Sequence, residues 1–314
     1  MKPPGPARIL PAQLSPGETA PDVSVVIANY NMGQYVAAAV QSVLDQPDFC
    51  LEVIVVDDGS TDGSLAALEP FRTDPRVRII AQPNRGQPRA KNAGLHASRG
   101  RYVAFCDADD CWLPNKLRVQ IPILERKPEV GVVYSPFITI DGAGRISQPP
   151  PFRFYRGKVL ETLFQTNIVP FGTAVVRRSC LEQWGGFDES IPMGIDWELW
   201  LRLAVRWEFD FADEATYVYR VWEGQMSKNW RGRYDYALRI MDQFLERHPG
   251  MLPAHIVRTA YADTYTNLAE AALADHGLAA AIAPLRRAFS YRLGYWPTWR
   301  LLLSAPIRAL KAPR

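Results

Sequence analysis

The sequence is poor in cysteine, and its cysteines do not lie at the spacings that bind zinc. Only four occur among the 314 residues, with no CxxC pair and no cluster of cysteine with histidine. This pattern argues against a zinc site and predicts reduced thiols in a cytoplasmic protein. The four histidines also show no metal-binding spacing, so we interpret them as incidental.

Long apolar runs and a large net charge are absent as well. No stretch approaches the ~18 consecutive apolar residues that a transmembrane helix requires. The net charge of +3 is too small to indicate a nucleic-acid partner. Hydrophobic residues at 47% and charged residues at 22% are typical of a folded protein, which excludes wholesale disorder. The length allows one large α/β domain with an appendage, or two modest domains.

The first 21 residues, MKPPGPARILPAQLSPGETAP, are rich in proline and lack the apolar core of a signal peptide. We expect residues 1–21 to form a flexible tail.

From Asp22 onward, apolar runs alternate with helical patterns. Strands are predicted at residues 23–28, 53–56, 77–80 and 102–106, and the second of them is continuously apolar, as expected for a sheet covered on both faces. Between the first two strands, Val36, Val40 and Val43 repeat at the spacing of a helix that packs on a sheet. Four strands separated by three helices predict a doubly wound, mostly parallel sheet.

The fourth strand runs directly into an acidic cluster, Asp107-Ala108-Asp109-Asp110. Asp107 and Asp109 are two positions apart, so both side chains can point to the same side of a strand end. Carboxylate oxygens suit hard divalent cations such as Mg²⁺ or Mn²⁺, which keep open positions for substrate phosphates. The alternative is an acidic surface turn that caps the helix beginning near Pro114.

Polar side chains also follow the other strands, at Asn29 and Tyr30 and at Asp57 and Asp58. Such a pattern across several strand ends is typical of a nucleotide crevice. However, no GxGxxG follows the first strand and no GxxxxGK[ST] occurs in the chain, so the dinucleotide and P-loop readings lose their support. A metal on the Asp107/Asp109 pair, helped by Lys91 or Arg89, would be sufficient to neutralise a diphosphate.

Four segments, SVVIANYN, VIVVDDGSTDGS, NRGQPRAKNAGL and GRYVAFCDADDCWLPNKL, closely resemble the family-2 glycosyltransferases in order and spacing. The resemblance covers residues 21–227 and implies a GT-A fold, a Rossmann-like, mostly parallel sheet flanked by helices. It also implies an inverting, metal-dependent transfer of a sugar from a nucleoside diphosphate, with a UDP-sugar as the default donor. The acceptor would be a hydroxyl of a glycan or lipid-linked molecule in polysaccharide or glycoconjugate synthesis.

The resemblance assigns roles by matching positions. The metal ligands would be Asp109 and Asp107, for Mn²⁺ or Mg²⁺. Lys91 stands where the family usually has arginine, which keeps the charge but loses the bidentate fork. The expected nucleotide-binding residues are Ala28, Asn29, Tyr30, Asp57, Asp58, Lys91, Asp107 and Ala108.

The segment GGFDES…DWELWLRL resembles the part of the family that carries the catalytic base, which matches Asp196. Ile195 replaces one member of the usual acidic pair. General-base help is typically worth ~10²–10⁴-fold in rate. On composition alone, Asp196 could merely cap its helix and complement the helix dipole. We expect the catalytic role, and we treat Trp197 beside it as a candidate substrate contact.

A departure from the family follows at Tyr217–Ser227, where Trp222 occupies a position that is often histidine. An indole cannot ligate a metal or protonate a phosphate, although it can stack on a sugar or base. The diphosphate would then depend more on Arg220, Lys91 or Lys228. Trp222 and Ile195 are also the only hints of a non-catalytic sugar-nucleotide-binding relative. A sugar-phosphate nucleotidyltransferase should instead carry a Gly-rich basic loop, and ANYNMGQY is not one.

These patterns predict a glycosyltransferase domain at residues 22–229, with a nucleotide-sugar half at 22–128 and an acceptor half at 129–229. Residues 230–314 would form a helical extension. Its last part, 285–314, contains no acidic residue and mixes basic with aromatic side chains, which suits an anionic membrane surface at the inner face of the cell membrane. A basic helix packed on the catalytic domain is the alternative. The basic residues of this part are Arg286, Arg287, Arg292, Arg300, Arg308, Lys311 and Arg314.

Overall fold

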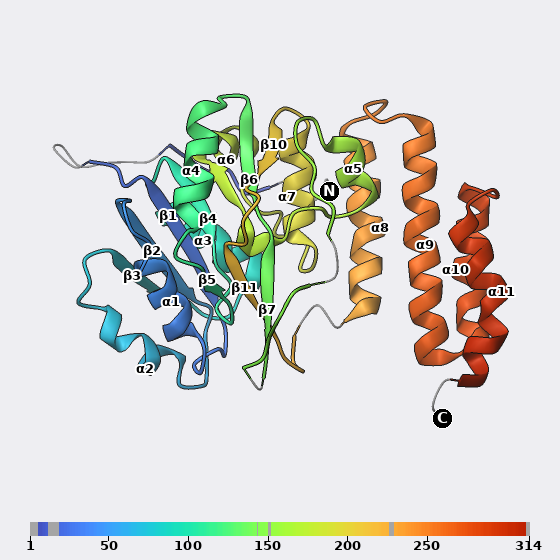
Figure 1. Cartoon of the computed structure of the whole chain (residues 1–314), viewed down its shortest axis with the longest axis horizontal. Coiled ribbons are helices and arrows are strands. Elements are labelled where there is room, and N and C mark those ends of the chain that lie inside the picture. The colour runs from blue at the N-terminus through green and yellow to red at the C-terminus, as the bar shows by residue number, and fades with distance from the viewer. Residues whose placement is uncertain (1–5, 12–18, 143, 150–151, 226–228, 312–314) are drawn as a thin grey trace. The chain divides into compact units, whose positions relative to one another are not determined.

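The computed structural model describes residues 6–11, 19–142, 144–149, 152–225 and 229–311, with side chains as far as residue 305. Lys228 and Arg314, and the side chains of Arg308 and Lys311, therefore lie outside the described part. The chain forms two compact units (Figure 1). The first combines Met1–Val159 with Ile168–Glu223, and the second combines Leu160–Asn167 with Gly224–Arg314. The sequence predicted a first domain that runs without interruption from residue 22 to residue 229. In the structure, the short segment 160–167 belongs to the second unit instead.

The first unit is built on a sheet whose described strands run in the order β10-β6-β9-β4-β1-β2-β3. Neighbouring strands are parallel except β9, which is antiparallel to both β4 and β6. This confirms the predicted mostly parallel sheet. The strands are β1 (Val23–Asn29), β2 (Leu51–Asp57), β3 (Val77–Ala81), β4 (Tyr102–Phe105), β6 (Val130–Tyr134), β9 (Val175–Arg177) and β10 (Glu208–Phe211).

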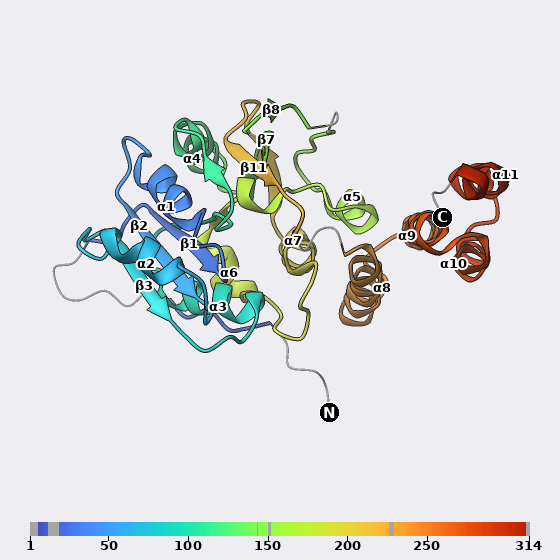
Figure 2. The same cartoon turned by 90° about the horizontal axis from the view of Figure 1, so that it is seen from below.

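Helices cover both faces of this sheet, which explains why its central strands are apolar throughout. In β2, Val53 and Val55 pack in one cluster with residues of α1 and α4, while Ile54 and Val56 pack with Ala90 of α3. Figure 2 shows α1 and α4 on one side of the sheet and α3 on the other. Alternation of side chains along a strand produces this division. The helices of the unit are α1 (Val36–Leu44), α2 (Ser64–Leu68), α3 (Gln87–Ala97), α4 (Lys116–Arg126), α6 (Arg178–Trp184) and α7 (Ile195–Ala204), with the 3-10 turn η1 (Glu69–Phe71).

A second, smaller sheet lies beside the acidic cluster. Its strands run in the order β5-β11-β7-β8, and β11 pairs antiparallel with β5 and parallel with β7. Because β5 directly follows the cluster in sequence, this pairing brings β11 against it. The strands are β5 (Cys111–Trp112), β7 (Phe137–Asp141), β8 (Ile146–Ser147) and β11 (Tyr217–Val221).

Phe171–Thr173 forms a 3-10 turn, η2, shortly before strand β9. The predicted flexible tail is wrong for residues 6–11. Ile9 is 2% exposed, and Ala7 exchanges backbone hydrogen bonds with Gly186 and Phe187. A short apolar anchor inside a proline-rich stretch is enough to hold it.

The second unit is helical, in agreement with the predicted extension. Its helices are α5 (Leu160–Gln165), α8 (Trp230–Arg247), α9 (Ala254–His276), α10 (Leu278–Tyr291) and α11 (Trp296–Lys311). Ala269, Leu273, Leu285 and Leu301 belong to an apolar cluster that joins α9, α10 and α11. Within the described residues, no helix combines the length and apolar character needed to cross a membrane.

Candidate active site

The carboxyl ends of β1 and β2 bring two predicted nucleotide residues into direct contact. The strands pair in register, so Asn29 lies opposite Asp57. Asn29 Nδ2 donates to Asp57 Oδ2 at 2.7 Å and to Ser60 Oγ at 3.1 Å. Both Asn29 and Asp57 are 1% exposed. Among the described residues Asn29 Oδ1 has no hydrogen-bond partner, which leaves a buried acceptor at this strand end.

Tyr30 and Ala28 lie at the same strand end and differ in accessibility. Tyr30 is 46% exposed, an unusually open position for a large aromatic side chain, while Ala28 is half-buried. An exposed ring beside buried polar groups can stack on a flat ligand.

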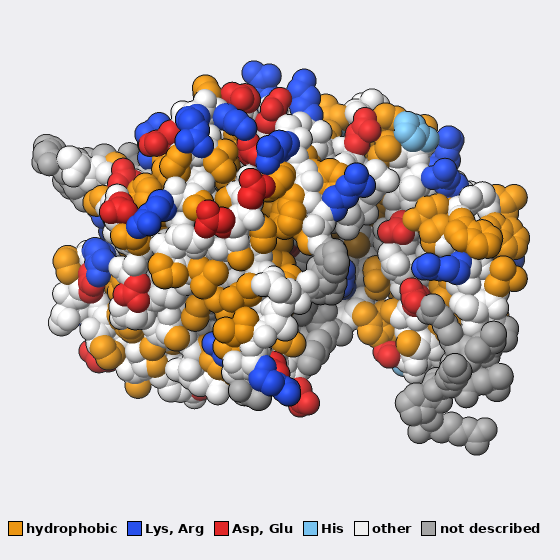
Figure 3. Space-filling model, viewed as in Figure 1, with side chains coloured by type: hydrophobic (Ala, Val, Ile, Leu, Met, Phe, Trp, Pro, Cys, Tyr) orange, Lys and Arg blue, Asp and Glu red, His pale blue; other side chains and the backbone are white. Residues whose placement is uncertain are grey.

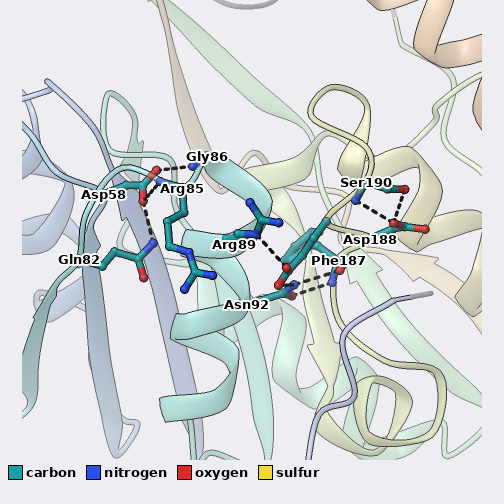
Figure 4. Close-up of polar contacts among 10 residues, drawn as sticks. Asp58, Gln82, Arg85, Gly86, Arg89, Asn92, Phe187, Asp188 and Ser190 are labelled. Carbon is teal, nitrogen blue, oxygen red and sulfur yellow. Dashed lines mark hydrogen bonds and ion pairs between the residues drawn. The ribbon is translucent and has the colours of Figure 1, made fainter. Parts of the chain in front are cut away.

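Asp58 is committed to the loop that precedes α3 (Figure 4). Its Oδ1 accepts from Gln82 Nε2 at 2.7 Å and from the Arg85 backbone N–H at 2.9 Å, and its Oδ2 accepts from the Gly86 backbone N–H at 2.8 Å. The side chain is buried. Of the two neighbouring aspartates, Asp58 therefore has a structural task, because it fixes the start of α3.

Lys91 of α3 connects to the acidic cluster at the end of β4. Its Nζ donates to Asp107 Oδ1 at 3.0 Å and lies 3.6 Å from the centre of the Phe171 ring. The lysine side chain is 4% exposed and that of Asp107 is 31% exposed. The ion pair thus places one buried positive charge directly beside the cluster. Phe171 in η2, which the sequence did not single out, supports it from below through a cation–π contact.

Asp109 is held by the residue that departs from the family. Trp222 Nε1 donates to Asp109 Oδ2 at 2.8 Å. Burial raises the pKa of Asp109, the negative charge of Asp107 raises it further, and the hydrogen bond from Trp222 opposes this. A nearby cation favours the ionised form of two carboxylates that repel each other.

Asp110, the third acid of the cluster, was not predicted as a site residue. Its Oδ2 accepts from Tyr217 Oη at 2.8 Å and its Oδ1 from the Arg220 backbone N–H at 2.7 Å. Burial, followed by the charges of Asp109 and Asp107, raises the pKa of Asp110 well above its usual range. Asp110 thereby ties β11 to the cluster. The unbroken acidic run was the only sequence signal for it.

Arg220 and Arg89, both expected near the diphosphate, lie in different surroundings. Arg220 Nε donates to the Asp109 carbonyl at 2.8 Å, and its guanidinium lies 4.5 Å from the Tyr35 ring centre. Arg220 is therefore part of the cluster. Arg89 Nε instead donates to Glu189 Oε2 at 3.0 Å, so this arginine points to the segment that precedes α7 (Figure 4).

The residues present fit a hard divalent cation with few protein ligands. In the described part of the chain, no group of three or more Asp, Glu, His or Cys side chains could hold a metal ion. Asp107 and Asp109 offer two carboxylates, and Ala108 between them is buried, with 3% of its surface exposed. Magnesium is commonly bound through one or two carboxylates together with waters and substrate phosphates.

Asp196 lies in the first turn of α7, as predicted, and Gly194 before it adopts φ 76°. Asp196 shares a helix face with Trp200, four residues later. The Trp200 ring lies 6.4 Å from that of Phe171, which in turn supports Lys91. These contacts connect the helix of Asp196 to the acidic cluster. Trp197 is only 8% exposed, so it belongs largely to the core.

The fold and this edge of the sheet define an α/β domain with a polar site where its parallel strands end. The sequence model of glycosyl transferase family 2 matches residues 24–185, about half of the chain. The succinoglycan biosynthesis protein ExoO of Rhizobium meliloti is 32% identical over 244 residues, covering 74% of this chain and 70% of that protein. This chain therefore belongs to glycosyl transferase family 2, and it is a glycosyltransferase.

Other similar proteins agree with this family. An uncharacterized glycosyltransferase of Nostoc sp. is 42% identical over 115 residues, which cover 36% of this chain and only 35% of that protein. Staphylococcus aureus TarS, solved with UDP-GlcNAc, superposes with a TM-score of 0.68 at 18% identity, covering 93% of this chain and 89% of that chain. The mannosyltransferase PcManGT of Pyrobaculum calidifontis superposes with a TM-score of 0.62 at 23% identity, covering 97% of this chain and 84% of that chain. Both share the fold.

Proposed function

We propose that this protein transfers a sugar from a UDP-sugar to a hydroxyl of a glycan or lipid-linked acceptor, with inversion and with a divalent cation, in polysaccharide synthesis. ExoO supports the setting by its name. TarS was solved with UDP-GlcNAc, and PcManGT with GDP-Man and Mn²⁺, which supports a nucleotide-sugar donor and a metal.

The observation that carries this proposal is the Asp107/Asp109 pair at the end of β4. Asp107 is paired with Lys91, yet its charge still raises the pKa of the half-buried Asp109 carboxylate. A bound cation would reduce the repulsion between these two negative charges. When bound there, a divalent cation would supply positive charge for the diphosphate of the donor.

The remaining chemistry falls to side chains of this chain. The Asp196 carboxylate takes the proton of the acceptor hydroxyl while the hydroxyl oxygen bonds to the anomeric carbon. The bond from that carbon to the diphosphate breaks on the opposite side, and the nucleoside diphosphate leaves. Lys91 and Arg220 lie beside the cluster and add positive charge for the leaving diphosphate. Tyr30 stacks on the base, and the buried Asn29/Asp57 pair provides polar contacts for the nucleoside.

Ligand-induced stabilisation of the purified protein tests the donor site. UDP, GDP, dTDP and CMP are each added with and without Mn²⁺, and thermal unfolding is recorded. A ligand at 100 times its dissociation constant adds ~2.7 kcal/mol to the free energy of unfolding. We expect stabilisation by UDP that requires Mn²⁺ and disappears in Asp109→Ala. Glu125→Ala, an exposed acid of α4, is the matched control and should behave as wild type. A folded protein stabilised by no nucleotide would refute the donor site.

We also propose that α11 attaches the protein to an anionic membrane surface. Its outward side chains are large and apolar: Trp296 is 65% exposed, Leu303 66% and Trp299 37%. Arg300 is exposed beside them, and no acidic residue follows Asp275 in the sequence. Figure 3 shows hydrophobic side chains gathered over α10 and α11. Apolar anchors combined with basic charge are characteristic of helices that lie in a lipid interface.

Vesicle flotation separates this surface from its alternatives. The protein should float with vesicles of phosphatidylglycerol, less with phosphatidylcholine, and little in Trp296→Ser/Leu303→Ser. Leu65→Ser, which alters an exposed leucine in the other unit, should float as wild type. Equal binding to both lipids would contradict the charge argument. Concentration-dependent dimerisation lost in the double variant would assign the face to a second copy.

A further inference from the structure

One helix, α3, contacts both halves of the proposed site through adjacent residues. Lys91 donates to Asp107 in the acidic cluster. The next residue, Asn92, exchanges two hydrogen bonds with the main chain of Phe187: Nδ2 donates to the Phe187 carbonyl at 3.0 Å, and Oδ1 accepts from its N–H at 2.8 Å. Neighbouring residues on a helix point in different directions, so α3 serves the cluster with one and the segment before α7 with the other.

The contact at Asn92 is tightly built. Asn92 is 2% exposed, and its Nδ2 also donates to Glu189 Oε1 at 3.1 Å (Figure 4). A Cβ on Gly186 would come within 2.5 Å of Asn92 Oδ1, so only glycine permits this approach. The Arg89–Glu189 pair next to it has side chains 45% and 36% exposed and contributes little, as exposed ion pairs do.

The segment held by Asn92 leads directly into the helix of the proposed base. From its other side, Arg202 of α7 donates to the carbonyls of Trp184, Gly185 and Gly186. The Phe187 ring packs against Phe105 of β4, with ring centres 5.5 Å apart, in the strand that ends at the acidic cluster. The segment is thus clamped between α3, β4 and α7, and Gly194 passes the chain into the turn of Asp196.

We propose that Asn92 is a positioning residue. By holding residues 186–189 on α3, it fixes the position of Asp196 relative to Asp107 and Asp109. The inference rests on the proposed function, because it assumes that Asp196 is the base. It goes beyond that function because it assigns a task to the buried Asn92 amide, which contacts neither substrate nor metal. This amide sets the distance between the base and the donor site. Loss of this amide lets α7 shift while Lys91 and Asp107 stay in place.

The test separates turnover from donor binding in the full chain. Mn²⁺-dependent release of nucleotide from UDP-GlcNAc, UDP-glucose and GDP-mannose, with water as acceptor, reports turnover. The dissociation constant of the corresponding nucleoside diphosphate with Mn²⁺ reports the donor site. Asn92→Ala should lower turnover at least tenfold and leave donor KM and nucleotide affinity within about twofold of wild type. Gly186→Ala, which pushes the amide away without removing it, should do the same and serves if Asn92→Ala does not fold.

Two comparisons decide whether Asn92 acts through the base. In an Asp196→Asn background, Asn92→Ala should reduce the residual turnover no further, because the group it positions is already lost. Arg78→Ala is the matched control, since it removes one hydrogen bond from the far end of α3, at the Ala97 carbonyl, and should leave turnover unchanged. Additive losses in the double variant, or a fall in nucleotide affinity with unchanged turnover, would overturn the inference. A wild-type protein that releases nucleotide from no donor would refute the proposed function instead, and the inference with it.

Discussion

Asp58→Asn distinguishes a structural carboxylate from a nucleotide ligand. In the wild type, two carboxylate oxygens accept from Gln82 Nε2 and from the N–H groups of Arg85 and Gly86. The asparagine side chain keeps only one oxygen. Its NH₂ group faces an N–H group that donates to a carboxylate oxygen in the wild type. Each lost hydrogen bond to a charged group costs about 1.5–3 kcal/mol. Counting one lost bond and two weakened ones, we expect about 2–4 kcal/mol of lost stability.

The loss converts into a measurable change of melting temperature. For a domain of 150–250 residues, 1 kcal/mol shifts Tm by about 2–4 °C, so the variant should melt about 4–16 °C lower. Thermal unfolding followed by near-UV circular dichroism gives this shift. Hydrogen exchange should show faster exchange of the Arg85 and Gly86 amides. The affinity for UDP with Mn²⁺, measured well below Tm, should change less than threefold, because both oxygens of Asp58 already accept hydrogen bonds from the protein.

Asp62→Asn is the matched control for this prediction. Asp62 also accepts from two backbone N–H groups, those of Gly33 and Ser64, but its side chain is exposed, so water replaces what is lost. We expect a stability change below about 1 kcal/mol. The reasoning on Asp58 would be refuted if Asp58→Asn melted like wild type while losing tenfold or more in UDP affinity.

Three further predictions address the base, a buried ion pair and a buried lysine. Asp196→Asn should lower turnover by ~10²–10⁴-fold with unchanged UDP affinity, and equal losses in both would contradict its role as base. Arg202→Ala should cost about 3–5 kcal/mol in chemical denaturation, because it strands the Glu198 carboxylate, in a pair whose side chains are each 6% exposed. Glu198→Leu/Arg202→Met should recover the part due to the stranded carboxylate but not the part due to the carbonyls of residues 184–186, which still lose their donor. An unaffected single variant would refute this prediction. Burial lowers the pKa of Lys116 from 10.5 to about 7, so between these values the unfolded chain binds a proton that the folded chain lacks, and stability should rise with pH. Lys116→Met should remove this rise, and identical pH profiles would exclude Lys116 as its source.

The sequence alone determined the fold class of the first unit and predicted the region of its candidate site. Apolar runs at 23–28, 53–56, 77–80 and 102–106 are local signals, and each became a strand of the central sheet. Parallel strands end at one edge, so polar residues after several of them had to gather there. The helices of 230–314 followed from apolar periodicity in the same way. The burial of a segment and the periodicity of its apolar residues are encoded in short windows of sequence, so both can be predicted from the sequence.

Only the tertiary structure decided what each polar side chain does. Asp57 and Asp58 are equivalent in sequence, yet one meets Asn29 and the other holds the start of α3. Asn92 and Arg202 carried no sequence signal for a task, and Asp110 had only its place in the acidic run, because the partners of Asp110, Asn92 and Arg202 lie 110, 95 and 18 residues away. Such contacts are set by how strands and helices pack, and no local pattern encodes them. The sequence therefore predicted the edge of the sheet at which polar residues gather, and packing decided which of them hold the frame, as Asp58 does, and which point elsewhere, as Arg89 does.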